Sequence, residues 1–157
     1  FKYWNNDLGV SYSHAPHYRE TAAAAILEMR RQVPQDVFDA EGLLQKGLLL
    51  RHLILPGQYR DSMRILDWVR ASLGEETLVS LMSQYTPLYR AKEIKALSRK
   101  LTTFEYEKVI DYFFEIGLKN GFMQKRSSAT GEYTPTFDLS GVVAAESFMK
   151  REENHHD

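Results

Sequence analysis

The chain has 157 residues, enough for one domain with a hydrophobic core, and its 43% hydrophobic and 26% charged residues are ordinary for a soluble globular protein. A formal net charge of -1 provides no basic field for nucleic acid or an acidic membrane, and no apolar run approaches the ~20 residues of a membrane helix. The absence of cysteine excludes disulfides, thiolate metal sites and a cysteine nucleophile from this chain and fits a cytoplasmic protein.

The first segments predict a strand remnant followed by a helix. Phe1–Trp4 is aromatic and strand-like, and because the chain opens on it without a methionine, we expect a piece of a longer protein. Residues 5–7 are expected to form a turn. An apolar stripe at helical spacing predicts a helix over residues 15–33, with Ser13 as its cap and Pro34 as its stop.

The central segments predict a buried strand and an amphipathic helix. Residues 37–47 read as a connection. Residues 48–55 form a nearly continuous apolar run that ends at Pro56-Gly57, which favours a strand buried on both faces; a short buried helix is the alternative that periodicity leaves open. Residues 60–73 carry an apolar stripe typical of a helix that packs on a sheet.

The remaining segments repeat the alternation of strand and helix. Residues 77–84 are a second strand candidate, and the basic residues 88–101 can form a short helix. A capping box that begins at Thr102 predicts a helix ending near Gly117, and residues 121–124 predict a third, short strand.

This order of elements predicts an α/β fold with right-handed connections between parallel strands. We expect three to four parallel strands with outer helices, a partial (β/α) barrel equal to about half of a TIM-like barrel. The half barrel is expected to span residues 1–142, and residues 143–157 to form a polar tail with little order.

Arg51 and His52 are the first candidates for chemistry. Strand alternation sends their side chains to opposite faces, one toward the helices and one toward a ligand. A cation within an apolar strand is costly unless it is paired or serves a ligand, and arginine suits a carboxylate or phosphate held by two contacts. The alternative is a structural pair that is satisfied inside the protein.

Polar residues also end the next predicted strand. Gln84 and Tyr85 lie at its carboxyl end, where parallel sheets bind ligands, and Ser80 and Met82 share the Gln84 face. We expect Gln84 to approach Arg51 on the concave side of the half barrel. Ordinary solvation of a strand end is the alternative.

Other motifs favour no catalytic site. His14 and His17 have a spacing seen in metal sites, but they lack a third ligand, so a solvated helix start is favoured and no metal is expected. The basic segment 92–100 is most simply a solvated face. No glycine-rich phosphate loop, no Ser/His/Asp arrangement and no pair of catalytic carboxylates is found in the sequence.

Several segments resemble radical S-adenosylmethionine (radical SAM) enzymes. Residues 1–3 are similar to the end of an Asp-x-Lys strand motif of the activases. Residues 50–57, LRHLILPG, resemble the arginine-containing strand and Pro-Gly of the pyruvate formate-lyase activating enzymes. Residues 79–87, VSLMSQYTP, resemble the next strand in a subgroup of uncharacterised homologues, and residues 117–122 with Phe137-Asp138 resemble its C-terminal end.

This resemblance implies the C-terminal part of a radical SAM enzyme, whose barrel binds S-adenosylmethionine at the carboxyl ends of its strands. A CxxxCxxC loop near the start of such enzymes holds a four-iron four-sulfur cluster, and a 5′-deoxyadenosyl radical takes hydrogen from a glycine of a partner glycyl radical enzyme. Lys2 and Arg51 would help hold S-adenosylmethionine, Gln84 or Tyr85 would lie near its ribose, and His52 is a further cofactor-binding candidate.

Because this chain has no cysteines to hold the iron–sulfur cluster, we expect it to be inactive on its own. Two other classes of function stay open from the sequence. One is a stand-alone α/β module that binds a small anionic ligand or a protein partner without catalysis, and the other is a purely structural or interaction domain.

Overall fold

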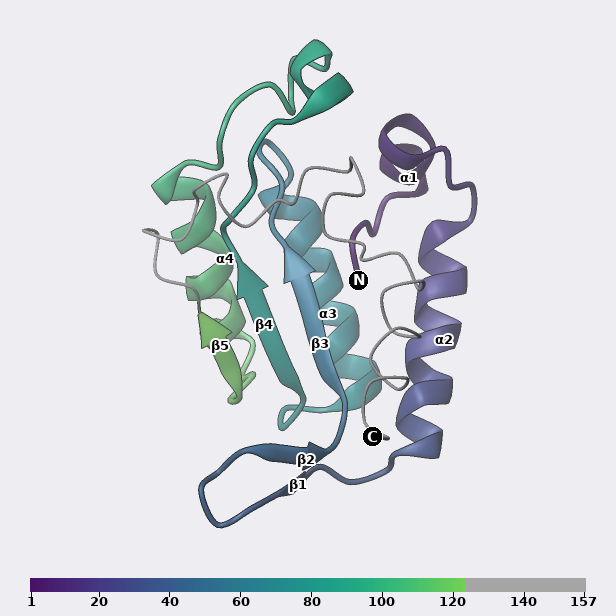
Figure 1. The fold of residues 1–157 in the computed structure, drawn as a ribbon, viewed down its shortest axis with the longest axis vertical. Helices are drawn as coiled ribbons and strands as arrows, with labels where there is room; N and C mark the ends of the chain where they lie inside the picture. Colours follow the sequence, from purple (N-terminus) through teal and green to yellow (C-terminus); the bar gives the residue numbers. More distant parts are fainter. Residues whose placement is uncertain (124–157) are drawn as a thin grey trace, which may run out of the picture.

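The structure, a computed structural model, describes residues 1–123, so the predictions for residues 124–142, the Phe137-Asp138 similarity and the polar tail lie outside it. The described elements form one sheet with helices on one of its faces, and a small hairpin beside it (Figure 1). In chain order they are α1 (Asn6–Ser13), α2 (Tyr18–Gln32), β1 (Val37–Phe38), β2 (Leu44–Lys46), β3 (Leu49–Leu53), α3 (Tyr59–Leu73), β4 (Leu78–Met82), the 3-10 helix η1 (Tyr89–Glu93), α4 (Thr103–Glu115) and β5 (Gly121–Met123).

The main sheet has the order β3-β4-β5, and both pairs of neighbours are parallel. Helix α3 connects β3 to β4, and α4 connects β4 to β5. The predicted α/β class, the three parallel strands and the two connecting helices are therefore confirmed. The three strands form an open sheet, and residues 1–123 contain no barrel.

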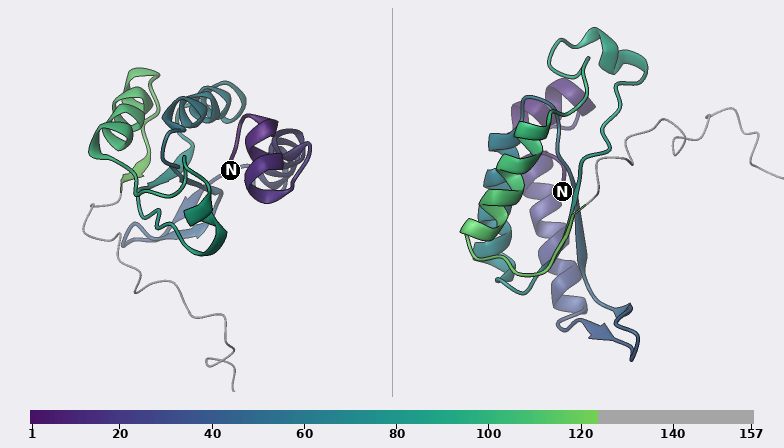
Figure 2. Two further views of the ribbon diagram at one scale, coloured as in Figure 1. Left: turned by 90° about the horizontal axis from the view of Figure 1, so that it is seen from above. Right: turned by 90° about the vertical axis from the view of Figure 1, so that its left-hand side faces the viewer.

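The core lies between the sheet and its helices. On β3, Leu50 and His52 point toward α3, whereas Leu49 and Arg51 point away and are exposed. The predicted strand is thus confirmed over the short-helix alternative, but its burial on both faces is wrong, because α3 and α4 cover the same face of the sheet (Figure 2). The fully buried residues of this core are Ile54, Ile65, Leu66, Val69, Val79, Leu81, Val109 and Phe113.

A second, smaller cluster closes the carboxyl ends of the strands. Tyr3, Leu55, Tyr85 and Leu97 are its buried members, with side chains of α1, α2 and the η1 region packed around them. These residues come from four separate segments, so the cluster fastens the N-terminal segment and the connection after β4 to the sheet.

Residues 1–4 form no strand, which corrects the first predicted element. Individual hydrogen bonds to distant residues hold their backbone instead. The amino group of Phe1 donates to the Arg51 carbonyl at 3.0 Å. The Trp4 and Asn5 amides donate to the Asp61 carboxylate at 2.8 and 2.9 Å. The expected turn at residues 5–7 is also wrong, because the Asn5 side chain accepts from the Asp7 amide and caps α1.

The predicted helix over residues 15–33 begins three residues later, at Tyr18, and ends at Gln32 before Pro34. Ser13 does not cap it: the Ser13 hydroxyl hydrogen-bonds the Tyr3 hydroxyl at 2.8 Å.

The expected connection at residues 37–47 is an antiparallel hairpin of β1 and β2. Its turn is built on Asp39, whose side chain accepts from the Glu41 and Leu43 amides, and on Gly42, whose φ of +79° suits glycine.

The predicted capping box of α4 is confirmed. The Thr102 hydroxyl accepts from the Glu105 amide, and the Glu105 carboxylate accepts from the Thr102 amide.

Candidate functional site

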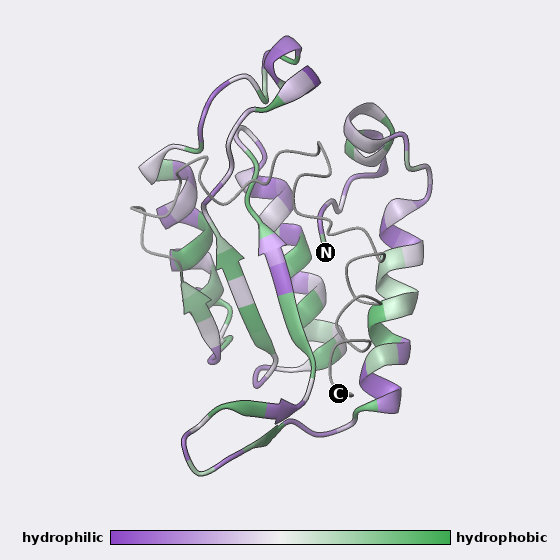
Figure 3. Ribbon diagram, in the orientation of Figure 1, coloured by the Kyte–Doolittle hydropathy of each residue, from purple (hydrophilic) through white to green (hydrophobic). Residues whose placement is uncertain are grey.

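The face of the sheet opposite α3 and α4 carries Arg51 midway along β3, an edge strand of the sheet. In the strand register Arg51 lies beside Ser80 of β4, and Ser80 lies beside Phe122 of β5. Figure 2 shows the helices on the other side of this sheet, and Figure 3 shows a hydrophilic stretch inside the otherwise hydrophobic β3. Arg51 therefore presents its charge on the side of the sheet that the helices leave open.

The guanidinium of Arg51 has no acidic partner among residues 1–123. Its Nη2 donates to the sulfur of Met82 at 3.0 Å, and none of the ion pairs of the described chain includes it. A thioether leaves the positive charge uncompensated, and a guanidinium offers several donors in one plane. The site is thus suited to an anionic group such as a carboxylate or phosphate.

His52 lies on the opposite face and is 2% exposed. Its Nδ1 is 2.8 Å from the Phe1 carbonyl, and its Nε2 is 2.8 Å from the Ser62 hydroxyl. Burial lowers the pKa of His52 to about 4, so the ring is neutral near pH 7, with Nδ1 donating to the carbonyl and Nε2 accepting from the hydroxyl. The ring joins β3, α3 and the N-terminal segment, as the structural alternative supposed.

Gln84 and Tyr85 follow β4 on different faces. Tyr85 is buried and its hydroxyl donates to the Leu97 carbonyl at 2.8 Å, so it belongs to the second cluster. Gln84 is two residues beyond Met82, so strand alternation places it on the same face as Arg51, and it is partly buried. The expected closeness of Arg51 and Gln84 stays a prediction, since the contact the structure shows for Arg51 is with Met82.

Lys2 is exposed, and its ammonium lies 5.3 Å from the centre of the Tyr3 ring. The hydrogen bond from Phe1 to the Arg51 carbonyl brings the Lys2 segment alongside β3. The N-terminal segment that carries Lys2 contacts β3 at Arg51 and at His52, since the Phe1 carbonyl also lies 2.8 Å from His52 Nδ1. A joint role of Lys2 and Arg51 in holding a ligand stays a prediction.

The Pro-Gly turn after β3 is held by a residue from a distant element. Glu105 of α4 is 6% exposed and accepts from the Gly57 amide at 2.6 Å. Arg99 donates to both of its oxygens at 2.7 and 2.8 Å, and these bonds, with those from Thr102, lower the pKa of Glu105 to about 2. Arg99 of the basic segment is thus structural. The capping-box motif predicted the role of Glu105 at the start of α4. Nothing in the sequence predicted its hydrogen bond with the Gly57 amide.

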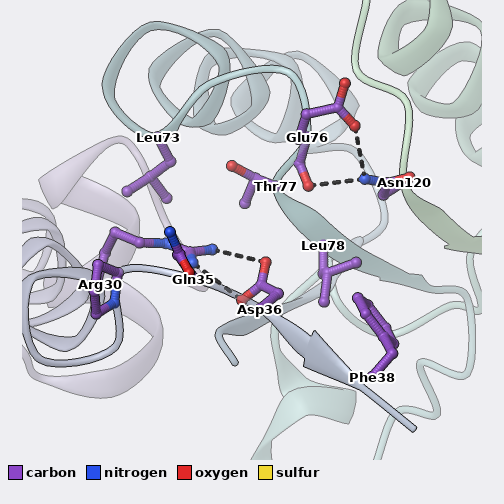
Figure 4. A pocket seen from close by; sticks show the side chains of 10 residues that line it. Arg30, Gln35, Asp36, Phe38, Leu73, Glu76, Thr77, Leu78 and Asn120 are labelled. Carbon is purple, nitrogen blue, oxygen red and sulfur yellow. Dashed lines mark hydrogen bonds and ion pairs between the residues drawn. The ribbon is translucent and has the colours of Figure 1, made fainter. Parts of the chain in front are cut away.

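The sequence did not predict the cavities of the described chain, and two of them are each lined by residues from several segments. A cavity of about 470 Å³ lies at the amino ends of the strands, where Arg30 pairs with Asp36 at 3.0 Å and Asn120 bonds Glu76 (Figure 4). A cavity of about 270 Å³ lies between α1 and the η1 region, and its lining includes His14.

Within residues 1–123, no group of three or more His, Cys, Asp or Glu side chains is placed to hold a metal ion. His14 and His17 both have left-handed backbone, at φ of 51° and 57°, where the chain turns from α1 into α2. None of the helices described combines the length and apolar character needed to span a membrane.

Comparison with known proteins gives one distant relative. The chain is similar to an uncharacterised protein of Methanocaldococcus jannaschii, with 29% identity over 114 residues that cover 71% of this chain and 29% of that protein. No protein-family profile matches the chain, and no significant match was found among solved structures. The chain therefore spans less than a third of the length of the curated relative it matches.

Proposed function

We propose that this chain is the C-terminal part of a cytoplasmic radical SAM enzyme similar to the pyruvate formate-lyase activating enzymes. The segments around Arg51 and Met82 support it by their resemblance to that family, and the parallel α/β sheet is compatible with half of its barrel. In this proposal the open sheet face is the inner, ligand-facing side, and the substrate of the whole enzyme is a glycyl radical protein.

The observation that carries the proposal is the uncompensated guanidinium of Arg51 on the open face of the sheet. Here the side chain is exposed, so it keeps its charge in solvent and can bind the methionine carboxylate of S-adenosylmethionine through two donors.

The iron–sulfur cluster of this family does not fit the residues present. The chain has no cysteine, and thiolates are the ligands that such clusters need. We therefore assign the cluster to other parts of a longer parent protein, where it would supply the electron for cleavage of S-adenosylmethionine. The proposed role of this chain is to bind and orient that molecule through Arg51 and Lys2.

A calorimetric titration of the chain with S-adenosylmethionine tests the proposal. Arg51→Ala should weaken binding by ~1.5–3 kcal/mol, the contribution of hydrogen bonds to a charged group, and Arg51→Lys should recover only part of it, because a point charge cannot reproduce a two-point contact. Arg64→Ala is the matched control, since Arg64 is also exposed but lies on α3, outside the open face. Equal affinity of wild type and Arg51→Ala, with normal thermal melts, would remove Arg51 from the site.

A second candidate is a stand-alone module that binds a small anion without catalysis. The lack of cysteine favours it, because binding of an anion by Arg51 requires no thiolate. Two observations separate the candidates: a CxxxCxxC motif upstream in the coding region, and preference for S-adenosylmethionine over inorganic phosphate in the same titration. Equal affinity for S-adenosylmethionine and for phosphate would support the module.

A further inference from the structure

Met82 is the side chain that accepts a hydrogen bond from the guanidinium of Arg51. Its sulfur accepts from Arg51 Nη2 at 3.0 Å, across the parallel pair of β3 and β4. Met82 lies opposite Leu53 in the register, two residues beyond the partner of Arg51. The guanidinium therefore leans along the sheet toward the carboxyl ends of the strands, where parallel sheets place their ligands.

The kind of group that accepts the hydrogen bond from Arg51 determines whether the guanidinium can also bind a ligand. A carboxylate there would form an ion pair and compensate the charge, whereas a thioether is a weak, neutral acceptor that orients the guanidinium and leaves its other donors available. We propose that Met82 is a positioning residue for Arg51, and that oxidation of its sulfur withdraws Arg51 from its ligand. The identity of that ligand, S-adenosylmethionine, rests on the proposed function.

The oxidation step requires a peroxide. Hydrogen peroxide transfers one oxygen atom to the sulfur: the O–O bond breaks, an S–O bond forms, the thioether loses two electrons and water is released. The sulfoxide oxygen is a much stronger hydrogen-bond acceptor than the thioether and is polar. It therefore competes with the ligand for the donors of Arg51. Met82 is only partly buried, so peroxide can reach it.

The first measurement is independent of any ligand. The side-chain N–H signals of Arg51 in ¹⁵N NMR spectra, assigned with Arg51→Lys, should shift on Met82→Leu, which keeps the apolar volume and removes the sulfur. Met29→Leu is the matched control, because Met29 is exposed on α2 and the guanidinium of Arg51 donates to Met82 instead. An Arg51 spectrum unchanged by Met82→Leu would overturn the positioning role.

The second measurement is affinity for S-adenosylmethionine before and after peroxide treatment, with oxidation verified as a mass increase. Wild type should lose about tenfold in affinity and recover it after treatment with methionine sulfoxide reductases. Met82→Leu should bind slightly more weakly than wild type and should not respond to peroxide. A response that persists in Met82→Leu would assign the effect to another methionine and overturn the switch.

The two measurements separate this inference from the proposed function. If untreated wild type does not bind S-adenosylmethionine, the proposed function fails, and the Arg51 spectra still decide whether Met82 positions the guanidinium. If binding is normal but Met82→Leu changes neither the spectra nor the affinity, the inference about Met82 fails and the proposed function stands.

Discussion

Glu105→Ala should be among the most destabilising single substitutions in the described chain. The carboxylate accepts from Gly57 at 2.6 Å, from Arg99 at 2.7 and 2.8 Å, and from the Thr102 amide and hydroxyl at 3.0 and 2.8 Å. Removing it leaves the Gly57 amide and the Arg99 guanidinium without their partner and breaks the capping box. Because Arg99 is 45% exposed and can rehydrate, we expect a loss of ~3 kcal/mol rather than the sum of the individual bonds.

The assay is urea unfolding at pH 7, followed by circular dichroism. The midpoint should fall while the slope of the unfolding free energy against urea stays constant. Glu107→Ala, an exposed residue on the same helix, should change the unfolding free energy by less than ~0.5 kcal/mol. Since the pKa of Glu105 is lowered from 4.5 to about 2, its contribution is complete above pH 4.5 and declines as the pH falls toward 2. Two results would contradict this prediction. One is a decrease of less than ~1 kcal/mol in the unfolding free energy of Glu105→Ala. The other is a difference in unfolding free energy between wild type and Glu105→Gln that stays constant as the pH falls toward 2.

Three further predictions concern the interior and the missing cluster. The pKa of His52 is lowered from 6.5 to about 4, so its contribution to stability is complete above pH 6.5 and declines as the pH falls through 4. In urea titrations the difference in unfolding free energy between wild type and His52→Gln should shrink over that range. A difference that stays constant would contradict this prediction. Gly121→Ala should cost ~1–3 kcal/mol, because the new Cβ would lie 2.9 Å from the buried ring of Phe113; in thermal melts the cost should shrink in a Phe113→Leu background, and strict additivity would argue against the clash. Reconstitution of the chain with iron and sulfide should give no cluster absorbance, because thiolate ligands are lacking, and a stable cluster would show that other ligands suffice.

The parallel sheet was predictable because its strands and helices have strong periodic signals. The apolar run of β3 with its Pro-Gly stop, the stripe of α3 and the capping box of α4 each specify an element locally. Helix α1 was missed because Gly9 lies in its interior, where helix propensity is low. The structure requires that glycine, since a Cβ would lie 2.8 Å from the Ala15 carbonyl, so close packing of α1 on the following turn overrides propensity.

The candidate site was predictable only in part. Alternation along β3 correctly sends Arg51 and His52 to opposite faces, but it does not say which face the helices cover. The contact between Arg51 and Met82 depends on the register of two strands that α3 separates in the chain. The hydrogen bond from the Gly57 amide to the Glu105 carboxylate joins residues 48 positions apart. Such contacts have no local pattern, so the sequence alone could not place them.

The fastening of residues 1–5 has a consequence for synthesis on the ribosome. The Arg51 carbonyl and the Asp61 carboxylate, which hold Phe1 and Trp4, lie 50 and 57 residues later in the chain. At about 5–20 residues per second, the nascent aromatic segment waits ~3–11 s for Asp61 to be added, and longer for Asp61 to leave the exit tunnel. During that interval the backbone of Phe1 and Trp4 lacks these partners, although Tyr3 can already contact Ser13 and Tyr18. The aromatic segment is therefore accessible to a chaperone that binds apolar nascent chain.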